Sequence, residues 1–143
     1  MPYEFLEDIA TADIAFRAWG KSLEEIFIAA SDATMNVMVE DLDSIQPVER
    51  RKLQLRNDAL DMLLFDLLQE IIYYKDTKKL MLRIHEIQIK KEDDQHMLKA
   101  KALGEKLDPK RHLTRADVKA VTLHSFQLTE TDEGWETQII LDI

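Results

Sequence analysis

The sequence predicts an α+β fold in which a mainly antiparallel sheet packs against two principal helices. Two segments place apolar residues at helical spacing, and the segments after Leu80 alternate apolar and polar residues with the period of two typical of strands. The expected order is strand, helix, strand, helix and then four strands. A run of strands after the helices favours antiparallel pairing. Residues 1–143 are expected to form one domain, because this length suffices to bury a core.

The first strand and first helix are predicted between residues 12 and 38. Alternation around Ile14 and Phe16 indicates the strand, which Gly20 ends. Ser22 and Glu25 have the spacing of a capping box, which marks a helix start. The apolar positions of this helix are Leu23, Ile26, Phe27, Ala30, Ala33, Val37 and Met38.

A short strand is expected around Leu53 and Leu55, before a second helix capped by Asn57 or Asp58. That helix has apolar residues over a broad arc, so we expect it to be the central helix of the core. Its inward positions are Leu60, Leu63, Leu64, Leu67, Leu68 and Ile71.

The second half of the chain is predicted to contain two hairpins. The apolar phase changes between Ile84 and Ile87, which indicates a β-bulge near residues 85–86. Residues 92–95 form the expected turn of the first hairpin, and a loop containing Gly104 should follow its second strand. Residues 118–128 and 135–143 should form the last hairpin.

The composition narrows the function. The chain has no cysteine and 3 glycines, so disulfides, thiolate chemistry and Gly-rich phosphate loops are excluded. No segment has the length and hydropathy of a membrane helix, and no export signal is recognisable, which predicts a cytoplasmic protein without a membrane partner. With a net charge of −9, we expect direct nucleic-acid binding to be weak or absent, although residues 75–119 are rich in lysine.

The histidines show no metal-ligand spacing. His112 is expected in a loop and His124 in the following strand, so the two rings could meet in space. Ordinary hydrogen-bonded histidines are the commoner explanation. No serine lies in a nucleophile-elbow context, and an autonomous enzyme is the least favoured class.

Acidic residues are the stronger functional candidates. Asp13 interrupts an apolar strand, and Asp142 lies one residue before Ile143 at the end of another. If the two strands are neighbours, both carboxylates and the terminal oxygens could bind a hard cation such as calcium. Two solvated aspartates remain the alternative. Asp41 and Asp43 form a second acidic cluster, for which a solvated turn is the alternative explanation.

Several segments together resemble one family in collinear order. They are FLEDIATADIAFRAWGKSLEEIF, MNVMVEDLDSI, LDMLLFDLLQEIIYY, DPKRHLTRADVKAVTLH and WETQIILDI. The sequence resembles archease over essentially its whole length. The resemblance implies an accessory protein, not an enzyme, that promotes guanylylation and repeated turnover of the RNA-splicing ligase of tRNA maturation.

The resemblance also implies a calcium site. Archeases build it from the aspartate of a TAD motif and the end of the chain, which correspond here to Asp13, Asp142 and Ile143. Many relatives have a histidine before TAD, where this chain has Ala10. A role for that histidine is therefore not carried over.

Further residues match the family pattern without an assigned chemistry. His112, Lys119 and His124 are expected to support the partner-facing surface, together with Asp41 and Asp43. Two other functions stay open at this stage. One is a metal-independent chaperone or adaptor for an RNA-modifying enzyme such as a tRNA methyltransferase, and the other is direct RNA binding through residues 75–119.

Overall fold

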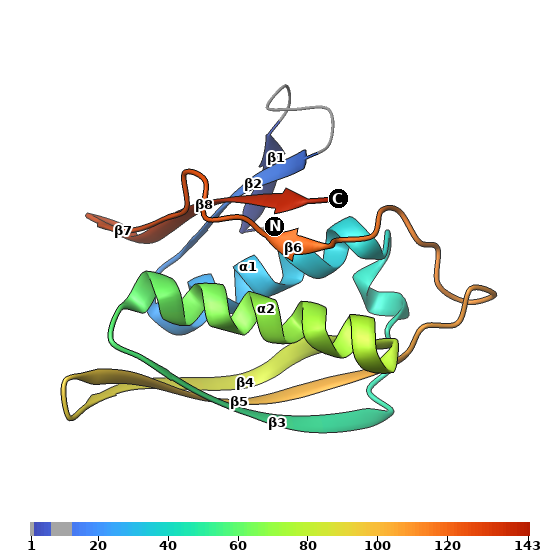
Figure 1. Cartoon of the computed structure of the whole chain (residues 1–143), viewed down its shortest axis with the longest axis horizontal. Helices are drawn as coiled ribbons and strands as arrows, with labels where there is room; N and C mark the ends of the chain where they lie inside the picture. Colours follow the sequence, from blue (N-terminus) through green and yellow to red (C-terminus); the bar gives the residue numbers. More distant parts are fainter. Residues whose placement is uncertain (1, 7–12) are drawn as a thin grey trace.

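The computed structural model describes residues 2–6 and 13–143 and arranges them in three layers (Figure 1). Helices α1 (Leu23–Met38) and α2 (Leu60–Lys78) form the middle layer. One sheet has the strand order β1-β2-β8-β6, with β7 also paired to β8, and the other has the order β3-β5-β4. All strand pairs are antiparallel. The predicted α+β class with two principal helices is confirmed.

The two sheets are called here the first and the second sheet. The first contains β1 (Tyr3–Leu6), β2 (Asp13–Gly20), β6 (Ala120–Val121), β7 (Gln127–Thr131) and β8 (Gly134–Asp142). The second contains β3 (Glu49–Asn57), β4 (Leu80–Glu92) and β5 (Gln95–Lys106). A short 3-10 helix, η1 (Leu42–Ser44), lies between α1 and β3. No helix in the described part of the chain combines the length and hydropathy needed to span a bilayer.

Helix α1, not α2, is the more deeply buried of the two, so the expectation for the central helix was wrong. Both helices contact both sheets. In α1, 11 of 16 residues are buried, against 6 of 19 in α2. Small residues explain the difference, because Ala29, Ala30 and Ala33 give α1 close-packed surfaces on more than one side. The sequence-based expectation counted large apolar residues, which favour α2 as the central helix, and gave no weight to these alanines.

The start of α1 follows the prediction and the start of α2 does not. The Ser22 hydroxyl accepts a hydrogen bond from the Glu25 amide at 3.1 Å, and the Glu25 carboxylate accepts one from the Lys21 amide. Helix α2 has Ala59 as its N-cap, without a side-chain cap. Asn57 instead accepts a hydrogen bond from the Ala59 amide, so it shapes the turn before the helix.

The β4-β5 hairpin confirms the predicted bulge and turn. The pairing register shifts between Ile84 and Glu86, and Asp93 and Asp94 adopt φ angles of 51° and 62° in the turn. Gly104 was expected in a loop but lies inside β5. A Cβ atom at this position would lie 1.7 Å from the Met81 carbonyl oxygen, so the glycine permits close approach of two strands.

The first sheet differs from expectation at two places. Strand β1 was not predicted; Tyr3 and Phe5 pair with Ala18 and Phe16 of β2. The expected strand at residues 118–128 is interrupted, because β6 and β7 pair separately with β8 and are joined by a turn. Strand β8 therefore has β2 on one side and two short strands on the other.

Candidate functional site

Asp13 and Asp142 are direct cross-strand partners at the end of the first sheet. The antiparallel register of β2 and β8 pairs Asp13 with Asp142, Ile14 with Leu141 and Phe16 with Ile139. Directly opposed residues project to the same face of a sheet, with Cβ atoms about 5 Å apart. Leu141 and Ile139 are core residues, so the aspartates lie on the opposite, outer face. The condition set for a shared site, that these two strands are neighbours, is met. We call Asp13 and Asp142 the aspartate pair.

Neither carboxylate of the aspartate pair has an ion-pair partner in the described part of the chain. Both residues are half-buried, and no ion pair or side-chain hydrogen bond joins either carboxylate to a residue in 2–6 or 13–143. Like charges opposed across a sheet destabilise it. An approaching cation would relieve this repulsion.

The backbone holds Asp142 firmly in place. Its carbonyl oxygen accepts a hydrogen bond from the Lys119 amide at 2.8 Å, and Ala120 of β6 is its second cross-strand partner. The Ile143 side chain is half-buried against the core. Lys119 thus contacts the site through its backbone, and its side chain is exposed.

The aspartate pair fits part of a hard-cation site. Calcium takes six to eight oxygen ligands from carboxylates, carbonyls and water. Asp13 and Asp142 supply two carboxylates, and the oxygens of Ile143 follow directly in the chain. In residues 2–6 and 13–143, no three histidine, aspartate or glutamate side chains are grouped closely enough to hold a metal. Backbone oxygens and water would have to complete the coordination. Ala10 and the first two residues of the TAD motif lie outside the described residues.

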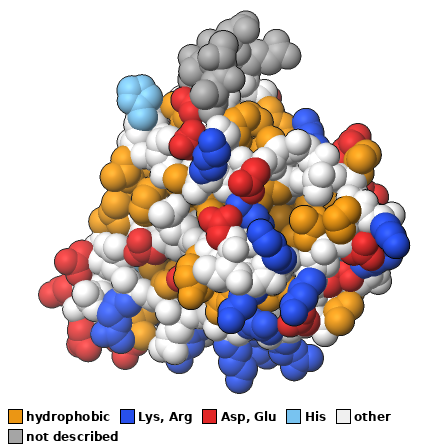
Figure 2. All heavy atoms as spheres, turned by 45° about the vertical axis from the view of Figure 1, so that its right-hand side comes forward, with side chains coloured by type: hydrophobic (Ala, Val, Ile, Leu, Met, Phe, Trp, Pro, Cys, Tyr) orange, Lys and Arg blue, Asp and Glu red, His pale blue; other side chains and the backbone are white. Residues whose placement is uncertain are grey.

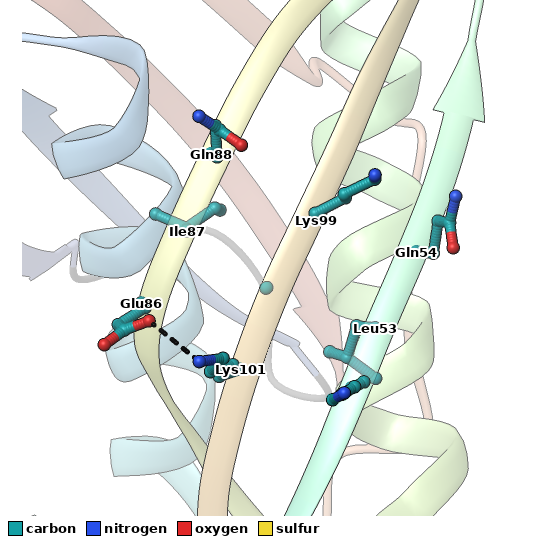
Figure 3. A pocket seen from close by; sticks show the side chains of 9 residues that line it. Leu53, Gln54, Glu86, Ile87, Gln88, Lys99 and Lys101 are labelled. Atoms are coloured by element: carbon teal, nitrogen blue, oxygen red, sulfur yellow. Dashed lines mark ion pairs between the residues drawn. The ribbon is translucent and has the colours of Figure 1, made fainter.

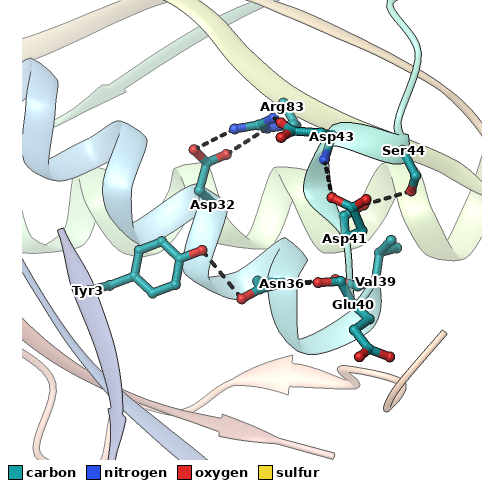
Figure 4. A network of polar contacts seen from close by, with 9 residues as sticks. All are labelled: Tyr3, Asp32, Asn36, Val39, Glu40, Asp41, Asp43, Ser44 and Arg83. Atoms are coloured by element: carbon teal, nitrogen blue, oxygen red, sulfur yellow. Dashed lines mark hydrogen bonds and ion pairs between the residues drawn. The ribbon is translucent and has the colours of Figure 1, made fainter. Parts of the chain in front are cut away.

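Asp41 and Asp43 have structural partners (Figure 4). Asp41 caps η1 by accepting a hydrogen bond from the Asp43 amide at 3.0 Å. Arg83 of β4 forms two hydrogen bonds of 3.1 Å to Asp32 of α1 and one contact of 3.4 Å to Asp43. Asp43 remains almost fully exposed, so the turn keeps part of its negative charge at the surface. The structure does not bring this cluster into contact with the aspartate pair.

The contacts of Arg83 with Asp32 and Asp43 connect β4 to α1 and to η1. The hydrogen bonds that Arg83 donates to Asp32, with a weaker contribution from Asp43, outweigh the effect of burial and raise the pKa of the Arg83 guanidinium. One turn further along α1, the Tyr3 hydroxyl lies 3.4 Å from Asn36, whose amide donates to the carbonyls of Val39 and Glu40. Burial of Tyr3 and the charge of Asp32 raise the pKa of its phenol.

His112 is a buried structural residue. Its Nδ1 accepts a hydrogen bond from the Asp108 amide at 2.8 Å, so the ring proton is on Nε2, which donates to the Glu105 carboxylate at 2.8 Å. Glu105 also accepts a hydrogen bond from the Gln46 amide at 2.9 Å and pairs with Arg111. We call these residues the Glu105 cluster. These contacts give His112 a structural role, in which it supports the loop after β5.

The Glu105 cluster controls the ionisation of its carboxylate. Burial raises the pKa of Glu105, but the Gln46 amide, Arg111 and His112 more than offset that effect and hold the pKa at about 2. Sequence reasoning missed this cluster because Gln46 and Glu105 are 59 residues apart. The spacing Glu-x₆-His carries no recognised signal.

His124 was expected in a strand but lies in the exposed turn between β6 and β7. His112 is enclosed beside Glu105, so the structure assigns these two histidines to different environments and does not make them a pair. His124 and the exposed Leu123 beside it belong to the surface of the first sheet.

Comparisons with known proteins agree with this fold. The model of the Archease protein family matches residues 3–143. The chain is 37% identical to Protein archease of Pyrococcus abyssi, covering 93% of this chain and 94% of that protein. It is 36% identical to Protein archease of Methanosarcina barkeri, covering 99% and 95%. This chain belongs to the archease family.

Two solved structures share the archease fold. The solution structure of protein 1598 of Methanobacterium thermoautotrophicum superposes with a TM-score of 0.85 at 31% identity, covering 99% of each chain. A crystal structure from Thermotoga maritima, described as an archease and possible chaperone, has a TM-score of 0.62 at 20% identity and supports the fold alone. The resemblance seen in the sequence is therefore confirmed.

Proposed function

We propose that this archease is an accessory protein that activates an RNA-splicing ligase by promoting its guanylylation and repeated turnover. Family membership supports an accessory role, and the cross-strand register of Asp13 and Asp142 is the observation that carries the choice of site. We further propose that Asp13, Asp142 and Ile143 bind calcium. A cytoplasmic location is part of the proposal, since the chain has no cysteine.

The aspartate pair would serve as the ligase-facing edge. Strands β2 and β8 hold both carboxylates on one face, and the Lys119 amide fixes the carbonyl of Asp142. A bound divalent cation would offset the phosphoryl charge that develops during guanylylation. The carboxylates themselves would orient the edge toward a cationic nucleotide site on the ligase. Asp43 adds negative charge on another face of the protein but is not required by this mechanism.

A ligation assay tests this proposal. The matching ligase is used at limiting concentration, with wild-type protein or with the Asp13→Ala/Asp142→Ala variant. We expect wild-type protein to produce multiple turnovers and the variant to produce no stimulation. The control, Glu130→Ala/Asp132→Ala, removes the same charge from exposed positions in β7 and in the turn that follows it, and should stimulate like wild type. Full stimulation by the aspartate variant would refute the proposed site.

The second candidate is a metal-independent chaperone or adaptor for an RNA-modifying enzyme such as a tRNA methyltransferase. This candidate is supported by the description of the Thermotoga maritima archease as a possible chaperone. A thermal-unfolding titration with calcium separates the two candidates, because a ligand of the native state raises the melting temperature. A melting temperature unaffected by millimolar calcium would favour the adaptor.

A further inference from the structure

The outer face of the second sheet concentrates positive charge in this acidic protein. Strands β3, β5 and β4 turn Leu53, Leu98 and Ala100 toward the helices, so the alternate residues project outward. The outward positions of these strands include six cations, all exposed, which we call the basic face: Arg50, Lys52, Arg56, Lys90, Lys99 and Lys101. Two exposed acidic residues, Glu86 and Glu92, share these outward positions.

The register aligns the basic face in rows that cross the three strands. One row is Lys52, Lys101 and Glu86; the next is Gln54, Lys99 and Gln88; a third is Arg56, Met97 and Lys90. Successive rows are about 6.8 Å apart, which is the repeat of two residues along a strand. The cations therefore form a two-dimensional array and not a single flexible tail.

Most of these charges are not neutralised within the protein. Among the six cations, only Lys101 has an ion pair with a described residue, at 3.5 Å from Glu86. Lys52 and Lys101 are directly opposed, and Lys99 lies two residues from Lys101 on β5, diagonal to Lys52. Directly opposed like charges reduce sheet stability. An external anion would remove this cost, so the arrangement favours binding.

The basic face contains a shallow groove over its centre (Figure 3). Lys99 and Lys101 project from β5 between Gln54 of β3 and Gln88 and Glu86 of β4. The backbone around Leu53, Ile87 and Ala100 completes the lining. In the space-filling view, Lys and Arg side chains gather along the lower margin of the molecule, on the side where Figure 1 draws the second sheet (Figure 2).

We propose that the basic face binds the phosphate backbone of RNA along the groove on β3, β5 and β4. Lys52, Lys99 and Lys101 would contact phosphates, and the amides of Gln54 and Gln88 would hydrogen-bond to ribose 2′-hydroxyls. This site lies on a different sheet from the aspartate pair and does not depend on the ligase proposal. It also revises the expectation from net charge, because the relevant charge is local.

The chemistry of the groove favours RNA over an acidic protein. Protein interfaces are centred on aromatic or aliphatic anchors. The outward positions of the second sheet carry no aromatic residue, and their apolar side chains Met97 and Leu103 are only partly exposed. Interfaces with nucleic acids are more polar and more positively charged. Without an aromatic platform for base stacking, binding should depend on phosphates and be insensitive to base sequence.

Binding of a fluorescein-labelled 20-nucleotide RNA of mixed sequence, measured by anisotropy in about 50 mM salt, tests the proposal. We expect the Lys52→Gln/Lys99→Gln/Lys101→Gln variant to bind at least about tenfold more weakly than wild type. For this variant, the slope of log K against log salt concentration should be less negative by about 2, because three phosphate contacts to a single-stranded ligand are lost. The control, Lys78→Gln/Lys106→Gln/Lys110→Gln, removes equal charge from exposed positions outside the groove and should bind like wild type.

Two further measurements make the assignment decisive. Wild-type protein should prefer RNA over DNA of the same sequence, and Gln54→Ala/Gln88→Ala should reduce that preference. The Asp13→Ala/Asp142→Ala variant should retain RNA binding, so failure of the ligase proposal is distinguishable from failure of this one. Equal RNA binding by the groove variant and its control would overturn the proposal. So would equal affinity for RNA and DNA, or binding of poly-aspartate without binding of RNA.

Discussion

The aspartate pair and the Glu105 cluster hold their carboxylates in opposite ways. Asp13 and Asp142 face each other across two strands without a cation among the described residues. Glu105 is enclosed by a guanidinium, an imidazole N–H and a backbone amide. A fully partnered carboxylate contributes to folding, whereas an unpartnered pair lowers stability until a ligand arrives. On this basis we assign Glu105 a structural role and propose Asp13 and Asp142 as ligand-binding residues.

Removing the carboxylate of Glu105 should have the largest effect on stability. Glu105→Ala leaves the buried Nε2–H of His112 and the partly buried Gln46 amide without an acceptor, so we expect a loss of about 3 kcal/mol of unfolding free energy. Urea denaturation at pH 7 measures this loss. Glu86→Ala, which removes an exposed ion pair, is the matched control and should cost less than about 0.5 kcal/mol. Equal effects of the two substitutions would contradict the comparison.

The contribution of Glu105 should depend on pH in one direction. Its pKa is about 2 in the folded protein, below the ordinary value of about 4.3 in an unfolded chain. The charged cluster therefore stabilises the protein fully above about pH 4.3 and loses this contribution as the pH falls toward 2. The stability difference between wild type and Glu105→Gln should shrink over that interval. A difference that is constant from pH 7 to pH 2.5 would show that ionisation is not its cause.

Arg83 offers an intermediate case, because Asp32 is half-buried and its second partner, Asp43, is almost fully exposed. Arg83→Met removes two hydrogen bonds to Asp32 and should lower the unfolding free energy by about 1 kcal/mol. Restoring neutrality with Arg83→Met/Asp32→Leu should recover part of that loss, since the remaining carboxylate is then absent. Chemical denaturation of the two variants and the wild type tests the coupling. If the double variant recovers no unfolding free energy, the unpaired Asp32 carboxylate is not the source of the loss in Arg83→Met.

The smallest effect on stability should come from the aspartate pair. Without calcium, Asp142→Asn should change the unfolding free energy by less than about 0.5 kcal/mol, or should raise it slightly by removing like-charge repulsion. With calcium, the variant should lose the increase in melting temperature expected of wild type. Differential scanning calorimetry with and without the ion tests both statements. A large loss of stability in the absence of calcium would place Asp142 among the structural residues instead.

The aspartate pair was predictable from the sequence, and the other charged clusters were not. The period of two around Ile14 and Leu141 assigned each aspartate to a strand, and the family resemblance paired them. The strand at Tyr3–Leu6 was too short for its pattern to stand out. Contacts between distant segments, such as Gln46 with Glu105, have no local signal.

The basic face shows the same limit at the scale of a surface. The sequence showed an excess of positive charge only in residues 75–119. Three of the six cations of the basic face, Arg50, Lys52 and Arg56, come from β3 instead. Only the pairing of β3 with β5 places the two sets together. The prediction of a loop at Gly104 failed for the same reason. In the sequence, a glycine that permits close contact between two strands cannot be distinguished from a glycine in a loop, and only the structure shows the neighbouring strand.

The position of α1 between the two sheets has a consequence for the dynamics of the protein. Strands of both sheets pack against this one helix, so neither sheet can open far without exposing its buried residues. The amides of α1 should therefore exchange with deuterium most slowly, at rates set by global unfolding. Both sheets should lose protection in the same transition. Two surfaces of opposite charge would then share a single cooperative unit.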